Sequence, residues 1–206
     1  MILVGMLDSP YVRRVAISAQ FLGIKYTVKP LSVFDNYKEL KKINPLAKAP
    51  SVILDDGSLL IDSSLIIDYM MRISTNKYLL MPKDDSQYRN ALYLTGVALV
   101  ATEKLVQVTY ETMRRPKDKI YQQWLDRVLE QMLTAFDQLE IAIRNDVKWF
   151  YNQRPTQADI TVAVAWRIAY EMLKEHIPIE RYPKLIQFSQ HAENLPEFSA
   201  CPIEPQ

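Results

Sequence analysis

Glycine is scarce in this chain, and its scarcity argues against one common kind of ligand site. The 206 residues include only four glycines, and neither a GxGxxG nor a GxxxxGK pattern occurs. Proteins that hold phosphates in a glycine-rich loop depend on such patterns, because glycine lets the backbone approach the phosphate closely. A nucleotide-binding loop of that kind is therefore not expected.

Cysteine and histidine are also scarce. The chain has one cysteine, Cys201, and two histidines, His176 and His191. One thiol cannot form an internal disulfide, so the framework of a disulfide-rich secreted protein is excluded and a reducing cytoplasm is the expected location. We interpret Cys201 as an incidental thiol of the tail. Neither histidine has a second ligand at metal-binding spacing, so no metal is expected.

Blocks of like charge and long apolar runs are missing as well. The formal net charge is +1, which gives no support to a nucleic-acid or membrane-surface partner. The first residues lack the basic region of a signal peptide, and no apolar run approaches the ~18 residues of a membrane span. With 49% hydrophobic and 24% charged residues, the composition is that of an ordinary soluble globular protein.

The first part of the chain mixes strand and helix patterns. The expected elements are a strand at 1–6, a helix from Pro10 to the stop at Gly23, a strand at 26–29, a short helix at 35–42, a hairpin at 51–61 and a helix after Ser63. Ser9 precedes Pro10 as a helix cap, and Gly23 ends the helix, which are typical residues for those positions. Arg13 and Arg14 fall between the apolar positions of the first helix, so they are expected to face outward or toward a neighbouring domain.

The stretch from Asn44 to Ser63 organises this first part. A polar loop broken by prolines leads into two short apolar runs, and Asp55-Asp56-Gly57 between them is a strong tight-turn signal. Asp62-Ser63 stands directly before an apolar helical pattern. An acidic residue or serine there caps the helix, and the free amides and positive dipole end of such a helix can also bind a ligand carboxylate.

The second part of the chain has only helical patterns. A polar connector places a domain boundary near residue 80, and long helices are expected at 87–110, 120–144, 160–173 and 181–198. Thr156-x-x-Asp159 predicts a capping box for the third of these, whose residues are apolar almost all round, so it is expected to be buried. Gly96, inside the first of them, would cost about 1 kcal/mol relative to Ala; close helix packing is one explanation for it, and the sequence does not decide whether it applies.

Taken in order, these motifs resemble the glutathione transferase family over nearly the whole chain. The motifs are Ser9-Pro10-Tyr11-Val12-Arg13-Arg14, Asn44-Pro45, Lys48-Ala49-Pro50, Asp62-Ser63 and Thr156-x-x-Asp159. The pattern is most similar to serine-type bacterial and tau-like members. The resemblance implies a thioredoxin-like α/β domain at residues 1–76, an all-α domain at 87–206, and a homodimer.

The resemblance also implies roles for individual residues. Ser9 would donate a hydrogen bond to the glutathione sulfur, although a plain helix cap is the alternative. The Ala49–Pro50 bond would be cis, with the Ala49 backbone pairing with the cysteinyl part of glutathione. Asp62 and Ser63 would hold the γ-glutamyl end; most members have Glu at the position of Asp62. Lys48 would reach the glycyl carboxylate, unless it is merely solvated. Members with Cys in place of Ser9 carry out thiol–disulfide chemistry, which Ser9 cannot.

The resemblance further implies a wall of aromatic and methionine side chains for a small hydrophobic or electrophilic second substrate. The candidates are Tyr11, Tyr110, Met113, Trp166 and Tyr170, each of which could instead be a core residue. The expected activity is addition of the glutathione thiolate to an electrophile or reduction of a peroxide. A non-catalytic binding or regulatory protein and another glutathione-dependent enzyme, such as a dehalogenase or an isomerase, stay open.

Overall fold

The computed structural model describes the chain except for residues 77, 79, 145–147, 152–153 and 204–206. The chain folds into two compact units. One unit holds Met1–Leu80 together with the chain from Asn194 onward, and the other holds Met81–Glu193. The end of the chain therefore packs with the α/β part, whereas the sequence pattern grouped it with the helical part.

The first unit is built on a four-stranded sheet of order β2-β1-β3-β4. Its strands are β1 (Ile2–Val4), β2 (Thr27–Lys29), β3 (Ser51–Ile53) and β4 (Leu59–Ile61). β1 and β2 are parallel, and β1–β3 and β3–β4 are antiparallel. A βαβ unit followed by a β-hairpin and a helix is the thioredoxin-like arrangement that the order of elements predicted.

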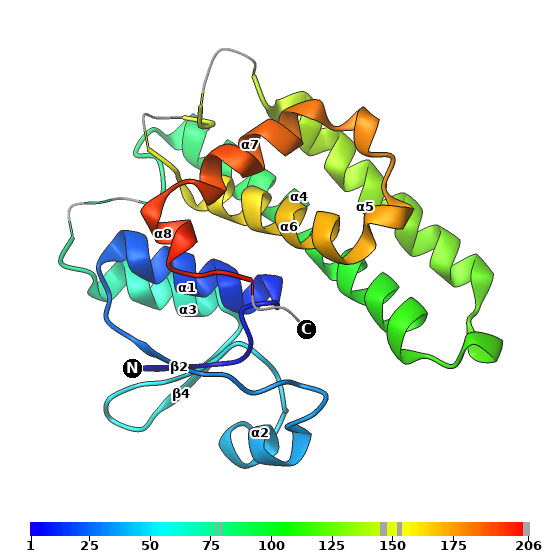
Figure 1. The fold of residues 1–206 in the computed structure, drawn as a ribbon. Helices are drawn as coiled ribbons and strands as arrows, with labels where there is room; N and C mark the ends of the chain where they lie inside the picture. Colours follow the sequence, from blue (N-terminus) through cyan, green and yellow to red (C-terminus); the bar gives the residue numbers. More distant parts are fainter. Residues whose placement is uncertain (77, 79, 145–147, 152–153, 204–206) are drawn as a thin grey trace. The chain divides into compact units, whose positions relative to one another are not determined.

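Helices cover both faces of this sheet. α1 (Pro10–Leu22) and α3 (Ser63–Ile73) pack side by side (Figure 1), and α2 (Tyr37–Ile43) lies beyond the sheet from them. Val4 packs with Leu40 of α2 in a small buried cluster. Because successive strand residues point to opposite faces, its buried neighbour Leu3 faces the other layer.

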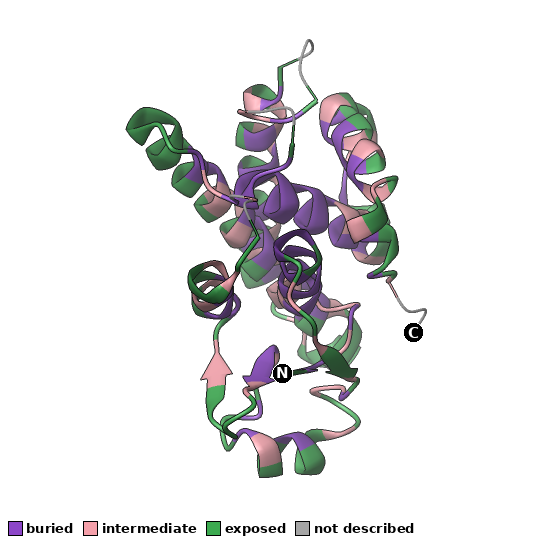
Figure 2. Cartoon of the chain, turned by 90° about the vertical axis from the view of Figure 1, so that its left-hand side faces the viewer, coloured by how far each residue is buried: buried purple, intermediate pink, exposed green. Residues whose placement is uncertain are grey.

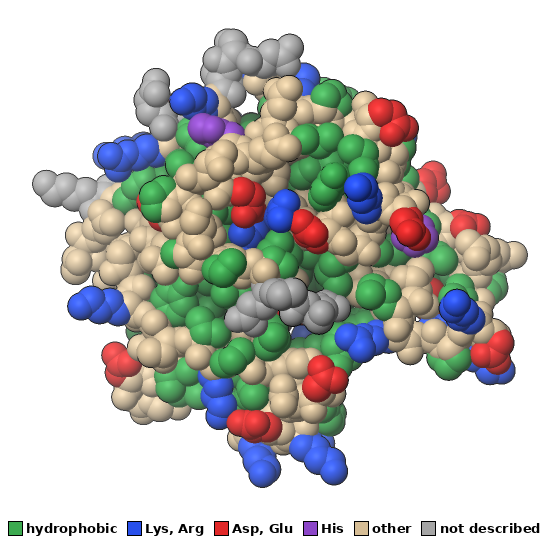
Figure 3. All heavy atoms as spheres, in the orientation of Figure 1, with side chains coloured by type: hydrophobic (Ala, Val, Ile, Leu, Met, Phe, Trp, Pro, Cys, Tyr) green, Lys and Arg blue, Asp and Glu red, His purple; other side chains and the backbone are tan. Residues whose placement is uncertain are grey.

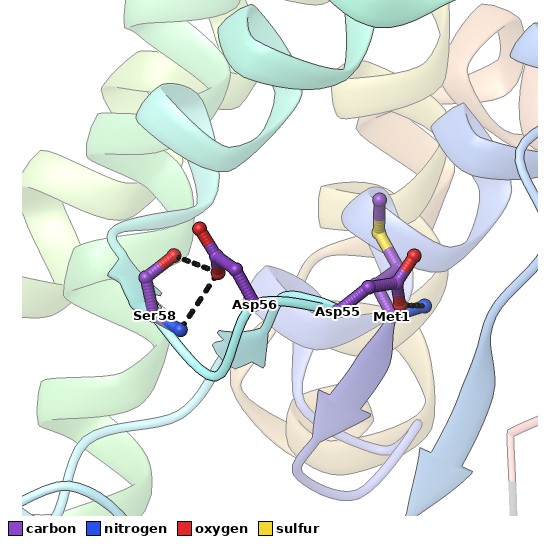
Figure 4. A network of polar contacts seen from close by, with 4 residues as sticks. All are labelled: Met1, Asp55, Asp56 and Ser58. Atoms are coloured by element: carbon purple, nitrogen blue, oxygen red, sulfur yellow. Dashed lines mark hydrogen bonds and ion pairs between the residues drawn. The ribbon is translucent and has the colours of Figure 1, made fainter.

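The hairpin turn is held by local hydrogen bonds (Figure 4). Asp56 accepts hydrogen bonds from the backbone amide of Ser58 at 2.9 Å and from its hydroxyl at 2.6 Å. These bonds lower the pKa of the Asp56 carboxyl. The N-terminal ammonium of Met1 lies 2.9 Å from the Asp55 carboxylate, and Gly57 has φ 83°, which suits glycine in a tight turn.

The second unit is helical. Its elements are α4 (Asp85–Thr109), a π-helical turn η1 (Tyr110–Arg114), the 3₁₀ turn η2 (Lys117–Lys119), α5 (Gln122–Ala142), α6 (Gln157–Leu173), the 3₁₀ turns η3 (Lys174–His176) and η4 (Ile179–Arg181), and α7 (Pro183–Glu193). α5 and α6 both pack along α4. α6 is buried over most of its length, so the buried colour in Figure 2 gathers inside this unit. The expected fold class, a thioredoxin-like domain followed by an all-α domain, is confirmed.

Several expectations about the helices are corrected by the structure. The last predicted helix is two helices, α7 and α8 (Pro196–Ser199), because the chain turns before Pro196. An added Cβ at Gly96 meets no atom within 4 Å, so packing in the described chain does not require glycine there.

By length and composition, the helical run Asp85–Arg114 is apolar enough to cross a membrane, which was not expected from the sequence. It is the helix against which α5 and α6 pack.

Both adjacent arginines of α1 are buried. The expectation was that they face outward or toward a neighbouring domain; the outward alternative was wrong, and the hydrogen bonds described for both go to residues of the first unit. Arg13 is 1% exposed. Its Nε donates to the Cys201 carbonyl at 2.9 Å, and its guanidinium lies over the Phe198 ring. Cys201 is itself buried, with its sulfur 3.5 Å from the Tyr26 hydroxyl. Arg13 thus anchors the end of the chain to α1.

Candidate functional site

Strand register brings the predicted site segments of the first unit to one edge of its sheet. Ser51, the first residue of β3, pairs with Val4 at the end of β1 and with Ile61 at the end of β4. The segments that continue from these strand ends are the loop to α1, the Ala49–Pro50 turn and the start of α3. The sheet therefore gathers Ser9, Ala49 and Asp62-Ser63, although up to 54 residues separate them in the sequence.

Gly5 allows the first two of these segments to touch. It follows β1 with φ 137°, and a Cβ built on it would lie 2.6 Å from Val12 Cγ2 and 3.0 Å from Ala49 Cβ. A Cβ contact under 3 Å is a clash, so a larger residue would push α1 away from the turn. Gly5 is a site-building residue that the sequence reading missed, because local patterns do not show a contact with residue 49.

Ser9 lies at the N-cap position of α1 with an extended backbone, and its side chain makes no capping hydrogen bond. Its carbonyl accepts from the Arg13 amide at 2.9 Å. The half-buried hydroxyl thus stands at the positive end of a helix without serving the cap. Such a hydroxyl can donate to an anion placed before the helix.

The loop before β3 is fixed by polar contacts, and its Ala49–Pro50 bond is cis. Buried Asn44 donates to the Lys48 carbonyl at 3.3 Å and to the Ser51 hydroxyl at 3.0 Å. Ser51 in turn donates to the Lys48 carbonyl at 2.7 Å. Asn44 and Ser51 therefore hold the backbone around Ala49, and the Lys48 side chain is exposed at the rim.

Asp62 caps α3 from an unusual backbone conformation. Its φ is 67° and its ψ is 126°, and its carboxylate accepts from the amides of Ser64 at 2.8 Å and Leu65 at 3.4 Å. Ser63 is buried behind it. The start of α3 thus presents an exposed carboxylate and a buried hydroxyl side by side, groups that can hold an ammonium and a carboxylate of a zwitterionic ligand.

Arg14 is the site-supporting residue that the sequence analysis placed wrongly. It is 2% exposed, and its Nη1 donates to the Ser63 hydroxyl at 2.8 Å and to the Ser64 hydroxyl at 3.1 Å. Burial lowers the pKa of Arg14 to about 10, and the nearby Asp62 carboxylate opposes this shift by raising the pKa. Arg14 therefore stays charged at neutral pH and links α1 to the start of α3.

The expected second-substrate wall divides into residues of different kinds. Tyr110 and Met113 are exposed on η1, and Tyr170 is half-buried with the Lys174 ammonium 5.5 Å from its ring. In the first unit, Tyr11 is half-buried on α1. Trp166 is 2% exposed and packs against Phe136 and Tyr182 with ring centroids 5.2 and 5.1 Å away. Trp166 is a core residue, so its proposed place in the wall was wrong.

The predicted capping box is present at the start of α6. The Asp159 carboxylate accepts from the Thr156 amide at 2.7 Å, the Thr156 hydroxyl at 2.6 Å and the Phe150 amide at 2.9 Å. Burial raises the Asp159 pKa to about 6, although these hydrogen bonds act in the opposite direction. Its contacts hold the helix start and the preceding loop, which is a structural role.

Comparison with known proteins agrees with this architecture. A cis-proline turn beside a serine-led helix on a thioredoxin-like sheet, followed by a helical domain, defines a two-domain protein of the thioredoxin-like class. The family profile described as "Glutathione S-transferase, N-terminal domain" matches residues 3–77, and "Glutathione S-transferase, C-terminal domain" matches residues 101–200. The chain belongs to the glutathione S-transferase family.

The relatives correct the expected subtype. Glutathione S-transferase Z2 of Arabidopsis thaliana is 23% identical over 200 residues, which cover 94% of this chain and 86% of the relative. Maleylacetoacetate isomerase of Pseudomonas aeruginosa is 22% identical over 192 residues, which cover 90% and 87%. Glutathione S-transferase U4 of A. thaliana is 30% identical, but over 91 residues that cover 44% and 40%. The matches over nearly the whole chain are therefore to glutathione S-transferase Z2 and to an isomerase, and they do not support the tau-like assignment.

Solved structures show the same fold. A glutathione S-transferase from Methylobacterium radiotolerans, crystallised with glutathione sulfonate, has a TM-score of 0.90 at 21% identity and covers 100% of this chain and 95% of its own. A glutathione transferase family member from Pseudomonas fluorescens Pf-5, crystallised with glutathione, has a TM-score of 0.83 at 26% identity and covers 100% and 98%.

Proposed function

We propose that this protein binds reduced glutathione at the sheet edge that carries Ser9, Ala49 and Asp62-Ser63, and that it activates the glutathione thiol. Asp62 and Ser63 would receive the γ-glutamyl end, the Ala49 backbone and the cis-Pro50 turn the cysteinyl part, and Lys48 the glycyl carboxylate. The residues present suit this ligand, since each of its charged ends meets a group of opposite charge or a donor. No metal is required for the chemistry.

The observation that carries the proposal is the Ser9 hydroxyl, which stands at the start of α1 but makes no capping bond. A hydroxyl there can donate to a thiolate, which would stabilise the anion and make it available as a nucleophile. The thiolate would then add to an electrophilic carbon of a small second substrate. Tyr11, Tyr110, Met113 and Tyr170 remain candidates for contact with that substrate.

Isomerisation is the second candidate activity, and whole-chain likeness to a maleylacetoacetate isomerase supports it. In that reaction the thiolate would add to a conjugated carbon–carbon double bond, the resulting single bond would rotate, and elimination would release the thiolate again. Both activities share the addition step and differ in whether glutathione leaves. Glutathione consumption therefore separates conjugation from isomerisation.

The test begins with retention on immobilised glutathione and calorimetry with free glutathione. Turnover is then followed with an electrophilic aryl halide, an organic peroxide and maleylacetoacetate, with free thiol measured in each case. Loss of thiol with the halide or the peroxide supports transferase or peroxidase chemistry, and isomerisation without loss of thiol supports the second candidate. A protein that binds no glutathione would overturn the proposal.

We also propose that two copies of the chain pair through contacts between the small domain of one and the helical domain of the other. α4 carries the exposed apolar residues Leu92, Tyr93 and Val100. Tyr93 and Val100 are seven residues apart, so they lie on one stripe of the helix, and Leu92 flanks that stripe. A groove of about 440 Å³ continues from it along α5, lined by Val97, Val100, Arg127, Glu130, Gln131, Thr134 and Ala135. Exposed apolar stripes with a polar border are typical of protein interfaces.

A further inference from the structure

The bonds of Arg14 dictate the direction of two hydroxyl protons. A guanidinium has only donors, so the Ser63 and Ser64 oxygens, at 2.8 and 3.1 Å from its Nη1, must both accept. A serine hydroxyl that accepts in this way keeps its own proton for another acceptor. The proton of the buried Ser63 hydroxyl therefore needs an acceptor other than Arg14.

The start of α3 offers a place for that acceptor. The Asp62 carboxylate already accepts from the amides of Ser64 and Leu65. Ser63 is therefore the residue of the first turn that is left to donate to an incoming anion. An incoming carboxylate would accept from the Ser63 hydroxyl at the positive end of the helix. The guanidinium behind this hydroxyl makes it a stronger donor, because hydrogen bonds in a chain polarise one another.

We infer that Arg14 is a positioning residue for ligand recognition: through Ser63 it selects the α-carboxylate at the γ-glutamyl end of glutathione. The inference rests on the proposed glutathione binding and adds a residue that does not itself touch the ligand. Its guanidinium is buried at 2% exposure and lies directly behind the Ser63 hydroxyl, to which it donates at 2.8 Å. A ligand carboxylate that accepts from Ser63 would therefore be attracted by the guanidinium on the far side of that hydroxyl.

The alternative is that Arg14 only fastens α1 to α3. A structural fastener would affect every ligand of the site alike, whereas the selecting role concerns one carboxylate. Three ligands separate these roles: glutathione, γ-aminobutyryl-cysteinylglycine, which lacks the α-carboxylate, and γ-glutamylcysteine, which lacks the glycine. Affinity ratios between ligands report each carboxylate separately for a given protein variant.

Calorimetry with wild type, Arg14→Lys, Arg14→Met and Ser63→Ala measures these ratios. Wild type is expected to prefer glutathione over the analogue without the α-carboxylate by about tenfold or more, as charge-assisted bonds imply. Arg14→Met should remove most of that preference, and Arg14→Lys should lose part of it, because an ammonium does not reproduce the guanidinium fork. The preference for glutathione over γ-glutamylcysteine should stay unchanged.

Arg13→Lys is the matched control, because Arg13 is an equally buried neighbour that holds the tail rather than α3. It should keep the α-carboxylate preference. In the Ser63→Ala background, Arg14→Lys should change the preference little further, since both act through one hydroxyl. If Arg14→Met does not fold, the Arg14→Lys and Ser63→Ala comparison decides.

If the Arg14 variants weakened the binding of all three ligands equally, the inference would be overturned, and Arg14 would only hold α1 against α3. If wild type bound none of the ligands, the proposed function itself would fail, which is a different outcome. Glutathione binding by wild type with an unchanged ligand preference in Arg14→Lys and Ser63→Ala would reject the inference and retain the function.

Discussion

In the proposed function, activation of the glutathione thiol depends on Ser9. A free thiol has a pKa near 8.5, and lowering it by two units takes about 2.7 kcal/mol. A hydroxyl that donates to the anion contributes about 1.5–3 kcal/mol, and the start of α1 adds about 0.3–1 kcal/mol. These terms suffice without a general base, and the sequence pattern places no histidine near Ser9.

Ser9→Ala is therefore expected to raise the pKa of bound glutathione and to lower kcat about tenfold or more, with little change in glutathione affinity. The hydroxyl gains most when charge is on the sulfur, so the ground-state complex loses little. A pH titration of thiolate absorbance in the complex measures the pKa, and Ser9→Thr, which keeps a hydroxyl, is the control. An unchanged thiol pKa in the alanine variant would show that Ser9 does not activate the thiol and only occupies the start of α1.

Asp62 caps α3 and, in the proposed function, also supplies a charge for the ligand; two substitutions separate the two roles. Asp62→Asn keeps a capping oxygen and tolerates positive φ, so it should retain stability while weakening glutathione binding about tenfold through loss of the charge. Asp62→Ala should bind weakly and also lose about 1 kcal/mol of unfolding free energy. Calorimetry and urea unfolding measure the two effects, and undiminished affinity in Asp62→Asn would remove the carboxylate from the site.

The candidate site residues that the sequence indicated, and that the structure brings together, lie in local motifs. Ser9 before Pro10 and Asp62-Ser63 before an apolar helix are visible in a few neighbouring residues. Arg14 was misplaced because its partners are 49 and 50 positions away, and a cationic residue inside an apolar pattern is normally solvent-facing. Trp166 was misplaced because helical spacing alone does not distinguish a wall residue from a core residue.

At the scale of elements, the start of α6 makes stability depend on pH. Asp159 has a pKa raised from 3.8 to about 6 by burial, so the folded state binds a proton more tightly than the unfolded state. Unfolding free energy therefore falls as pH rises from about 4 through 6, by on the order of 3 kcal/mol. Protonation of Asp159 therefore stabilises the folded state below pH 4, and this pH-dependent stabilisation is absent from a variant that does not titrate at this position.

Urea unfolding of wild type and Asp159→Asn between pH 4 and 7 checks this expectation. The wild-type free energy should decline relative to that of the variant across the window, although Asp159→Asn is less stable throughout because one capping acceptor is lost. Parallel pH dependences would show that Asp159 titrates normally. Loss of turnover without loss of stability in Asp159→Ala would contradict its structural role.

The junction between β1 and α1 depends on the missing side chain of Gly5. In Gly5→Ala the new Cβ would meet Val12 and Ala49 at 2.6 and 3.0 Å, and the backbone has φ 137°. Strain and overpacking together should lower unfolding free energy by about 2–5 kcal/mol. Gly57→Ala is the control, since φ is 83° there but no atom lies within 4 Å, so it should cost only about 1–2 kcal/mol.

Urea unfolding of both glycine variants measures the difference. Equal losses would mean that backbone conformation alone matters and that the contact with Ala49 is not tight. A larger loss for Gly5→Ala accompanied by weaker glutathione binding would tie the junction to the site.

The order of helices and strands was predictable because the residues that start and end them are visible in short stretches of sequence. Pro10 and Gly23 bound α1, and the Thr156–Asp159 box begins α6, as expected. The break before α8 was missed because the helical pattern continues on both sides of Pro196. The attachment of the tail to the first unit depends on Arg13 and Cys201, which are 188 residues apart, and no local pattern reveals such a contact.

At the scale of the whole molecule, surface charge leaves room for self-association. The formal net charge is +1, and acidic and basic side chains are interspersed on the face shown in Figure 3. Two copies would therefore meet with little mutual repulsion. The exposed apolar stripe of α4 is the surface that the proposed pairing would cover.

Sedimentation at micromolar concentration is expected to give the mass of a dimer, since two-fold pairs are the commonest soluble assemblies. Tyr93→Glu places a charge in the middle of the stripe, where Tyr93 is 56% exposed, and should shift the equilibrium toward monomer by at least tenfold because a desolvated, unpaired carboxylate is costly. Gln187→Glu adds the same charge at an exposed position of α7 and should leave the dimer intact. A wild-type monomer would contradict the pairing, and a dimer that tolerates Tyr93→Glu as well as Gln187→Glu would place the interface away from α4.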